Sequence, residues 1–249
     1  MLDKEAYAAE LEPFRRYLEQ TLDRPVQIPI ADSYTAAAEA LVTGEAGYAS
    51  LPPNLYVQTR SAHPDVQLLA MKVFDHSNGH DALLMLPSES TAGCLEDLRG
   101  KTFCYPDPKS TSGYVLPTYR MREAGLDPAK DFVLRESGNH HQVLRDLVDG
   151  TCDLGATYAG ALRTADEVGI QISLLRTLLI TGRTPHDAIV SFRVDAAERE
   201  AMRQALLNFD PASVVDRARL GEMERVTGFE PIDDSRYDEL REVVGLSGE

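Results

Sequence analysis

The sequence predicts an α/β protein of two lobes, each a mostly parallel sheet flanked by helices. Segments with helical spacing of apolar residues alternate with short apolar strands along most of the 249 residues. The stretches 38–52 and 144–160 repeat one order of helix, Gly turn and strand, one in each half of the chain. Such joints also arise in α/β proteins without any duplication, so the repeat leaves both origins open. No Pro- or Ser-rich linker occurs, and the lobes are therefore expected to be joined by strands or short hinges.

The first half of the chain is predicted to begin with an amphipathic helix over residues 5–22. Apolar residues recur there at helical spacing with charges between them, and Arg24-Pro25 ends the helix. Asp32 or Ser33 is expected to cap the next helix, which ends at Gly44. The elements predicted after the first helix are a strand over 26–30, a helix over 35–42, a strand over 48–51, a helix after Pro52-Pro53 and a strand over 66–73.

The second half continues the alternation. Gly100, Gly125 and Gly150 each follow a helical segment, which is the usual place of a C-terminal glycine. The predicted elements are a strand over 82–86, a short helix over 95–100, a strand over 102–105, a helix over 114–124, a strand over 132–134, a helix over 141–148 and a strand over 153–157.

Composition and charge argue against several classes of protein. Forty acidic and 25 basic side chains give a formal net charge of −15, which repels a phosphate backbone, so nucleic acid is not expected as a partner. No apolar run reaches the ~20 residues of a membrane-spanning helix. The best stretch, 170–180, is interrupted by Gln171 and Arg176. No membrane span is therefore predicted.

The three cysteines, Cys94, Cys104 and Cys152, contain no C-x-x-C pair. An odd number cannot form a closed disulfide framework, so at most one disulfide is possible. The alternative, which we take as the expectation, is that they are small buried thiols.

One loop carries the clearest chemical signal. Three consecutive hydroxyl residues, Ser110, Thr111 and Ser112, precede Gly113 between a predicted buried strand and a predicted helix. The N–H groups of a first helical turn, the positive end of the helix dipole and three hydroxyl donors would converge there on a tetrahedral oxyanion. The loop lacks the pattern of a nucleotide-binding P-loop. Taken alone, it also fits ordinary helix capping.

The stretch 107–117 resembles the D-P-x-S-T-S-G-x-x-x-P signature of the periplasmic phosphonate-binding proteins of ABC importers, a group that also takes up phosphite and related phosphorus oxyanions. The similarity extends through 98–103, His140 and 148–155, and covers the chain from the first helix to about Phe209. It implies a two-lobed type II periplasmic-binding-protein fold with the ligand cleft between the lobes. The implied function is capture of a phosphonate, phosphite or phosphate ester for an ABC permease.

The resemblance also implies the binding residues, because these positions match the family's ligand contacts. They are Tyr34, His80, Ser110, Thr111, Ser112, His140 and Asp187. Three positions depart from the family's pattern: His80 stands where Tyr is usual, Gly47 where Asp often opens the strand, and Gly160 where binders of aminoalkylphosphonates carry an acidic residue.

The chemistry of these residues suits a buried dianion. Neutral hydroxyl and N–H donors stabilise it without a fixed cluster of arginines. We expect His140 to be protonated and to add one positive charge. Asp187 would repel an oxyanion unless a proton lies between them, so it is expected to accept a hydrogen bond from P–OH or to orient a donor. Purely structural roles remain open: Tyr34 in a core, His140 at a helix cap and Asp187 in a turn.

The predicted lobes are formed by residues 1–78 with 190–249 and by residues 82–184. Two crossings, near 79–81 and near 185–188, would act as the hinge on which the lobes close over a ligand.

Two other functions stay open. An enzyme is disfavoured because the six histidines show neither H-E-x-x-H nor H-x₃-H spacing and no G-x-S-x-G elbow occurs, so no catalytic residue, metal or cofactor is expected. A sensor domain of the same fold would report the ligand to a signalling partner, and the full-length gene would distinguish it from a transport protein.

The start of the chain bears on localisation. It shows no basic segment followed by an apolar one, so the protein is either cytoplasmic or begins after an export signal. The resemblance favours a periplasmic or extracytoplasmic place. Related proteins open with a strand of the type L-x-x-G-x-x-P before the first helix. Either this strand lies upstream of Met1, which we expect, or another segment fills its place.

Overall fold

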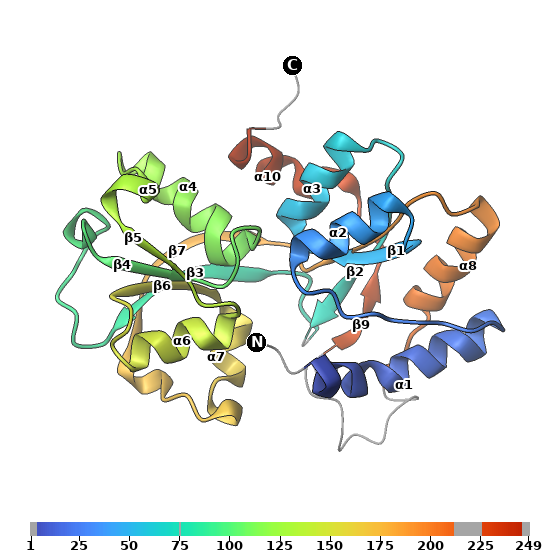
Figure 1. Cartoon of the computed structure of the whole chain (residues 1–249), viewed down its shortest axis with the longest axis horizontal. Coiled ribbons are helices and arrows are strands. Elements are labelled where there is room, and N and C mark those ends of the chain that lie inside the picture. The colour runs from blue at the N-terminus through green and yellow to red at the C-terminus, as the bar shows by residue number, and fades with distance from the viewer. Residues whose placement is uncertain (1–3, 75, 212–225, 246–249) are drawn as a thin grey trace. The chain divides into compact units, whose positions relative to one another are not determined.

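The computed structural model describes residues 4–74, 76–211 and 226–245. Their contacts divide the chain into two compact units (Figure 1). The central unit contains residues 80–184 with 239–249, and the terminal unit contains residues 2–79 with 185–238. The chain passes between the units after Gly79, after Thr184 and after Asp238. The hinge motion expected near 79–81 and 185–188 stays a prediction.

The central unit is built on a five-stranded sheet in the order β5-β4-β6-β3-β7. β4 pairs in parallel with β5 and β6, whereas β3 pairs antiparallel with β6 and β7. The strands are β3 (His80–Pro87), β4 (Thr102–Tyr105), β5 (Val133–Glu136), β6 (Leu154–Tyr158) and β7 (Leu175–Thr184).

Helices cover both faces of this sheet, α4 and α5 on one side and α6 and α7 on the other (Figure 1). The alternation of side chains along β3 explains why both faces need cover. Leu84 and Leu86 pack into the cluster around Phe103 and Met121, and Leu83 and Met85 pack into the opposite cluster on α6 and α7. The helices are α4 (Leu116–Glu123), α5 (Pro128–Asp131), α6 (His140–Val148) and α7 (Ala159–Thr164).

The terminal unit contains a four-stranded sheet in the order β1-β8-β2-β9, and all of its pairs are antiparallel. The strands are β1 (Tyr48–Leu51), β2 (Gln67–Phe74), β8 (Ala188–Ser191) and β9 (Val226–Glu230). Because β8 follows the return of the chain from the central unit, residues far apart in sequence become neighbours in this sheet.

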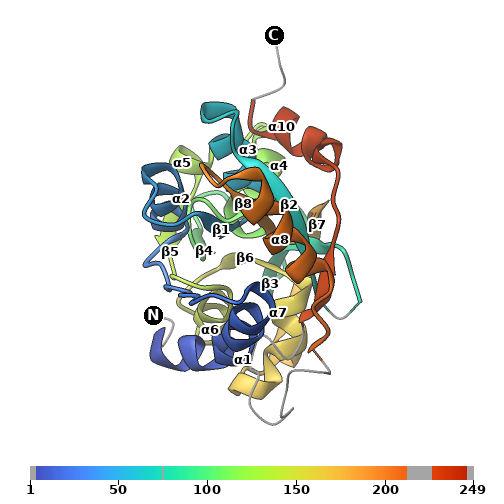
Figure 2. The same ribbon diagram turned by 90° about the vertical axis from the view of Figure 1, so that its right-hand side faces the viewer.

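One face of this sheet is covered by α1 and α8, which bury an aromatic and aliphatic cluster that includes Leu18, Phe209 and Phe229 (Figure 2). Ile189 of β8 packs against that cluster, and the alternate residue Val190 is buried on the other face, where α2 and α3 lie. The helices are α1 (Lys4–Leu22), α2 (Tyr34–Thr43), α3 (Pro53–Ala62), α8 (Ala196–Leu207) and, from the end of this unit into the other, α10 (Asp238–Val243).

Most predicted elements are confirmed, including the Ser33 cap, whose hydroxyl accepts a hydrogen bond from Ala36 N at 3.1 Å, and the left-handed Gly44 stop at φ +85°. Two predictions are wrong. The pairing is mostly antiparallel, since β8 runs antiparallel to β1 and β2, β9 to β2, and β3 to β6 and β7. Residues 26–30 form no strand; Val26 and Ile28 instead pack on the α1/α8 cluster.

The cysteines also differ from the expectation of free buried thiols. Cys104 on β4 and Cys152 before β6 form a disulfide inside the α6/α7 core, and Cys94 is an exposed free thiol. Within the described residues, no helix combines the length and apolarity needed to cross a membrane.

Candidate functional site

The hydroxyl loop of the central unit begins as a tight turn after β4. The Asp107 carboxylate accepts a hydrogen bond from Lys109 N at 2.6 Å, and its carbonyl accepts one from Ser110 N at 3.0 Å. Such turns are favoured by Asp with Pro at the next position. The chain then enters a single π-helical turn, Thr111–Val115, which continues directly into α4. The sequence predicted an α-helix from about residue 114, and the π turn is what places the hydroxyls at its start.

Ser110 is the N-cap of this turn. Its Oγ accepts a hydrogen bond from Gly113 N at 3.1 Å. Ser110, Thr111 and Ser112 are only 3%, 3% and 4% exposed, although neutral hydroxyls are usually found at the surface. A Cβ on Gly113 would lie 2.3 Å from Pro106 Cγ, so only glycine fits beneath that ring. The loop therefore holds three hydroxyls in one buried place.

His140 lies beside this loop at the first position of α6. Its Nε2 is 3.4 Å from Ser110 Oγ, and its Nδ1 is 3.2 Å from the hydroxyl of Thr157, a fully buried residue of β6. The Asn139 side chain caps the helix by accepting from Gln142 N at 2.8 Å. The structure thus brings His140 and Ser110 together, and the capping role that the sequence left open for His140 belongs to Asn139.

The expectation that His140 adds a positive charge beside a bound dianion stays a prediction, and burial of the ring opposes it. Desolvation of the ring, aided by the charge of neighbouring His141, lowers the pKa of His140 to about 3. A neutral imidazole donates from one nitrogen and accepts at the other, which suits a place between two hydroxyls. At this place His140 can therefore act as a neutral hydrogen-bonding group.

His80 and His140 both make ring contacts with Tyr158. The Tyr158 ring centroid lies 4.8 Å from that of His80 and 4.7 Å from that of His140. Sequence reasoning missed both Thr157 and Tyr158. Their position at the carboxyl end of a strand parallel to β4, where the hydroxyl loop also begins, is the signal that would have found them.

Asp187 lies in the terminal unit just before β8. Its Oδ2 is 3.7 Å from Lys72 Nζ and 3.5 Å from Ser50 Oγ, and its carbonyl accepts from Lys72 N at 3.2 Å. Lys72, which the sequence analysis did not select, supplies a cation that offsets the Asp187 charge. The carboxylate that the sequence analysis predicted as a ligand contact therefore has a cation beside it within its own unit.

The remaining predicted residue, Tyr34, opens α2 directly after the Ser33 cap and is half-buried. A second tyrosine of the terminal unit, Tyr237, has a buried hydroxyl with no hydrogen-bond partner among the described residues. Burial raises the pKa of Tyr237, and the neighbouring Tyr56 and Asp187 add to this effect. Its ring centroid lies 4.7 Å from that of Tyr56.

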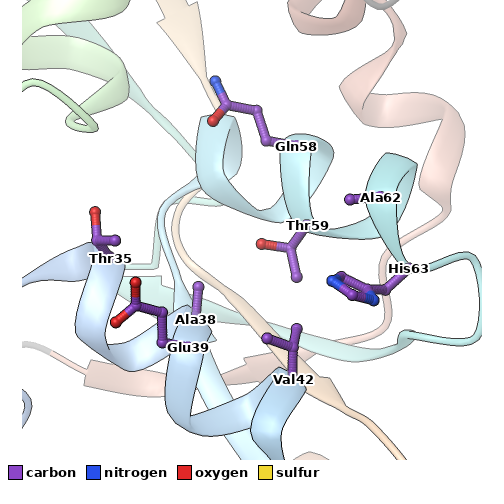
Figure 3. A pocket seen from close by; sticks show the side chains of 8 residues that line it. All are labelled: Thr35, Ala38, Glu39, Val42, Gln58, Thr59, Ala62 and His63. Atoms are coloured by element: carbon purple, nitrogen blue, oxygen red, sulfur yellow. The ribbon is translucent and has the colours of Figure 1, made fainter.

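A separate hollow of about 200 Å³ opens between α2 and α3 (Figure 3). Figure 3 shows the apolar side chains of Ala38, Val42 and Ala62 together with the polar ones of Thr35, Glu39, Gln58, Thr59 and His63. No residue of the predicted site lines this hollow, and we therefore do not assign the oxyanion to it.

Among the described residues, one group has ligand atoms close enough together to hold a metal ion, Cys104, Asp146 and Cys152. Both of its sulfur atoms are joined in the disulfide, which removes them as thiolate ligands.

A comparison with known protein families matches nearly the whole chain, including the hydroxyl loop. A family model described as the periplasmic substrate-binding protein of phosphonate ABC transporters matches residues 1–237. The chain belongs to this family. The resemblance inferred from the 107–117 signature is confirmed, as are the α/β class of the periplasmic-binding-protein fold and the function as a transporter substrate-binding component.

Three relatives show how far this phosphonate-family binding protein has diverged. It is 23% identical over 267 residues to the phosphate-import protein PhnD of Mycolicibacterium smegmatis, which covers 96% of this chain and 81% of the relative. A binding component of a phosphonate transporter from Pseudomonas aeruginosa superposes with a TM-score of 0.83 at 18% identity, over 97% of this chain and 82% of the other. PhnD1 of Prochlorococcus marinus, solved with methylphosphonate, gives a TM-score of 0.80 at 20% identity, over 97% and 93%.

Proposed function

We propose that this protein binds a small tetrahedral phosphorus oxyanion at the hydroxyls of Ser110, Thr111 and Ser112 and delivers it to an ABC permease. The observation that carries the proposal is the burial of these three hydroxyls at the start of a helix, next to His140. Hydrogen bonds to an anion are each worth about 1.5–3 kcal/mol, so three of them give a large share of a micromolar affinity.

The helix supports the same conclusion. The π turn and α4 form one helical segment from Thr111 to Glu123, whose N-terminal N–H groups and dipole favour negative charge. Its basic residues, Arg120 and Arg122, lie in the last turn, away from the hydroxyls. Anion binding at this loop would therefore rest on neutral donors, which hold an oxyanion without tying it to a fixed cation.

The proposal assigns His140 as a neutral hydrogen-bonding group and His80 as a wall of the site. Tyr34 and Asp187 belong to the proposal through their match to the family's ligand contacts. Lys72 joins them as the partner of Asp187, because an anion beside an unneutralised carboxylate would be repelled.

The disulfide supports a place outside the cytoplasm, since such bonds persist in oxidising compartments. Relatives named as import or periplasmic proteins support the same place. We therefore propose an extracytoplasmic location, with the permease of the same transporter as the protein partner.

Calorimetric titration tests the proposal. The wild-type chain is expected to bind methylphosphonate, phosphate or phosphite, and the triple variant S110A/T111A/S112A to bind none of them measurably. Because Ser110 is also a helix cap, the control is Asp195→Ala, which removes the cap of α8 and should leave affinity unchanged. Equal affinity of wild type and triple variant would overturn the site, and binding of none of the three oxyanions by wild type would overturn the ligand class.

A further inference from the structure

Tyr158 contacts His140, which in turn lies beside the hydroxyl loop. It is the last residue of β6, and its half-buried ring lies between two histidines. The His140 ring meets it edge-on, at an interplanar angle of 84°, and the His80 ring is tilted by 53°. We call these three residues, His80, Tyr158 and His140, the aromatic row. All three belong to the central unit.

The aromatic row begins at the hydroxyls. His140 contacts both the Tyr158 ring and, at 3.4 Å, Ser110 Oγ. The oxygens of a ligand bound by Ser110 would therefore lie at the His140 end of the aromatic row. Tyr158 is the next ring along the row. The substituent on the central atom of the ligand is the part that would meet this tyrosine.

Gly160 explains how the ring comes to lie there. A Cβ on Gly160 would be 2.3 Å from Tyr158 Cε2 and 2.9 Å from Cδ2, so any side chain at position 160 would displace the ring. The backbone of Gly160 does not lie in the left-handed region, which means that its conformation alone does not require glycine. The glycine is required by the ring that folds over it.

We propose that Tyr158 is the specificity-determining residue for ligand length: it admits oxyanions with hydrogen, hydroxyl or methyl on phosphorus and rejects those with longer alkyl chains. This inference rests on the proposed function. Tyrosine suits the role because its ring is rigid and has only two side-chain torsions to fix. A pocket wall that excludes added methylene groups discriminates by about 10–200-fold.

The test compares two probes, methylphosphonate and n-butylphosphonate, by calorimetry on the whole chain. For wild type the dissociation constant of n-butylphosphonate is expected to exceed that of methylphosphonate by at least about tenfold. In Tyr158→Ala this ratio should fall at least about fivefold, mainly through tighter binding of the butyl compound. Tyr158→Phe keeps the ring and should keep the wild-type ratio. Gly160→Ala, which moves the ring, should shift the ratio in the same direction as Tyr158→Ala.

Controls separate this inference from the proposed function. Tyr119→Ala removes a tyrosine of α4 and should leave the ratio unchanged. If wild type binds methylphosphonate but the ratio is the same in wild type and in both Tyr158→Ala and Gly160→Ala, the inference is overturned and the proposed function stands. A wild-type preference for 2-aminoethylphosphonate over methylphosphonate would also overturn it, because the rings would then be binding an ammonium group by cation–π contact. Failure of wild type to bind either probe overturns both.

Discussion

His140 Nε2 lies 3.4 Å from Ser110 Oγ, and the hydroxyl of Thr157 holds the other ring nitrogen at 3.2 Å. Thr157 can donate to Nδ1 while Nε2–H donates to Ser110, an arrangement that leaves the Ser110 proton for a ligand oxygen. A protonated ring would donate from both nitrogens, and Thr157 would then accept at its hydroxyl oxygen and not donate. Burial of the ring lowers the pKa of His140 and so favours the first arrangement.

The first prediction concerns stability and pH. The unfolded chain takes up a proton on this histidine near pH 6.5, whereas the folded chain does so only near pH 3. Between these values the unfolded state holds more protons, so the free energy of unfolding rises with pH. Relative to His140→Gln, wild type should lose stability as the pH falls below 6.5, by up to about 1.4 kcal/mol per pH unit.

Urea unfolding of wild type and His140→Gln, between about pH 7.5 and 4.5, measures this slope. The matched control is His76→Gln, which removes an exposed histidine. A stability difference between wild type and His140→Gln that is flat over this range would contradict the assignment of a neutral ring.

The second prediction concerns Gly113. A methyl group there would lie 2.3 Å from Pro106 Cγ and 2.8 Å from Ser110 Oγ, so Gly113→Ala must move the loop. Overpacking of this kind typically costs about 1–3 kcal/mol, and we expect oxyanion affinity to fall at least about tenfold. Gly93→Ala is the matched control, since the nearest atom to its new methyl group would be 3.9 Å away. Calorimetry showing equal affinities for both variants would place the anion elsewhere.

The third prediction concerns the pair Lys72 and Asp187. Lys72→Met leaves the Asp187 carboxylate without its cation, and oxyanion affinity should fall about fivefold, as expected for a partly exposed ion pair. Adding Asp187→Asn should restore most of that loss by removing the repulsion. The control is Lys101→Met in the central unit. Lys101 pairs with Asp153, and its replacement should leave oxyanion affinity unchanged. If the double variant binds still more weakly than Lys72→Met, Asp187 acts through a hydrogen bond from the ligand instead.

The strands show what local sequence can and cannot predict. Residues 102–105 were predicted as a strand and are one, because both of their faces are buried and every residue is a good strand former. Residues 26–30 have a similar alternation yet pair with no described strand; the backbone of Val26 is hydrogen-bonded by the side chains of Glu19 and Arg15 instead. Leu175–Thr184 was missed because its outward residues include the exposed Ile180, which obscures the period of two.

The candidate site likewise contains residues that the sequence could predict and residues that it could not. Ser110, Thr111 and Ser112 lie on one contiguous stretch, so their convergence follows from the strand–loop–helix pattern. Thr157, Tyr158 and Lys72 contact residues far away in sequence, and Thr157 and Tyr158 are found only once β6 is known to pair in parallel with β4. The low pKa of His140 likewise depends on burial by distant residues, which no local pattern indicates.

The last prediction concerns the disulfide. Cys104 and Cys152 close a loop with a sequence separation of 48, and a cross-link of this span typically contributes about 2–4 kcal/mol. The variant C104A/C152A should be destabilised by about that amount in urea unfolding, and wild type should lose a similar amount in a reducing buffer. Cys94→Ala, which removes the exposed thiol, should have no effect on either measurement.

Because Cys104 lies on the strand that leads into the hydroxyl loop, oxyanion affinity should also fall in C104A/C152A. Alkylation of the unreduced, denatured wild-type chain should label one cysteine, and labelling of all three would rule out the bond.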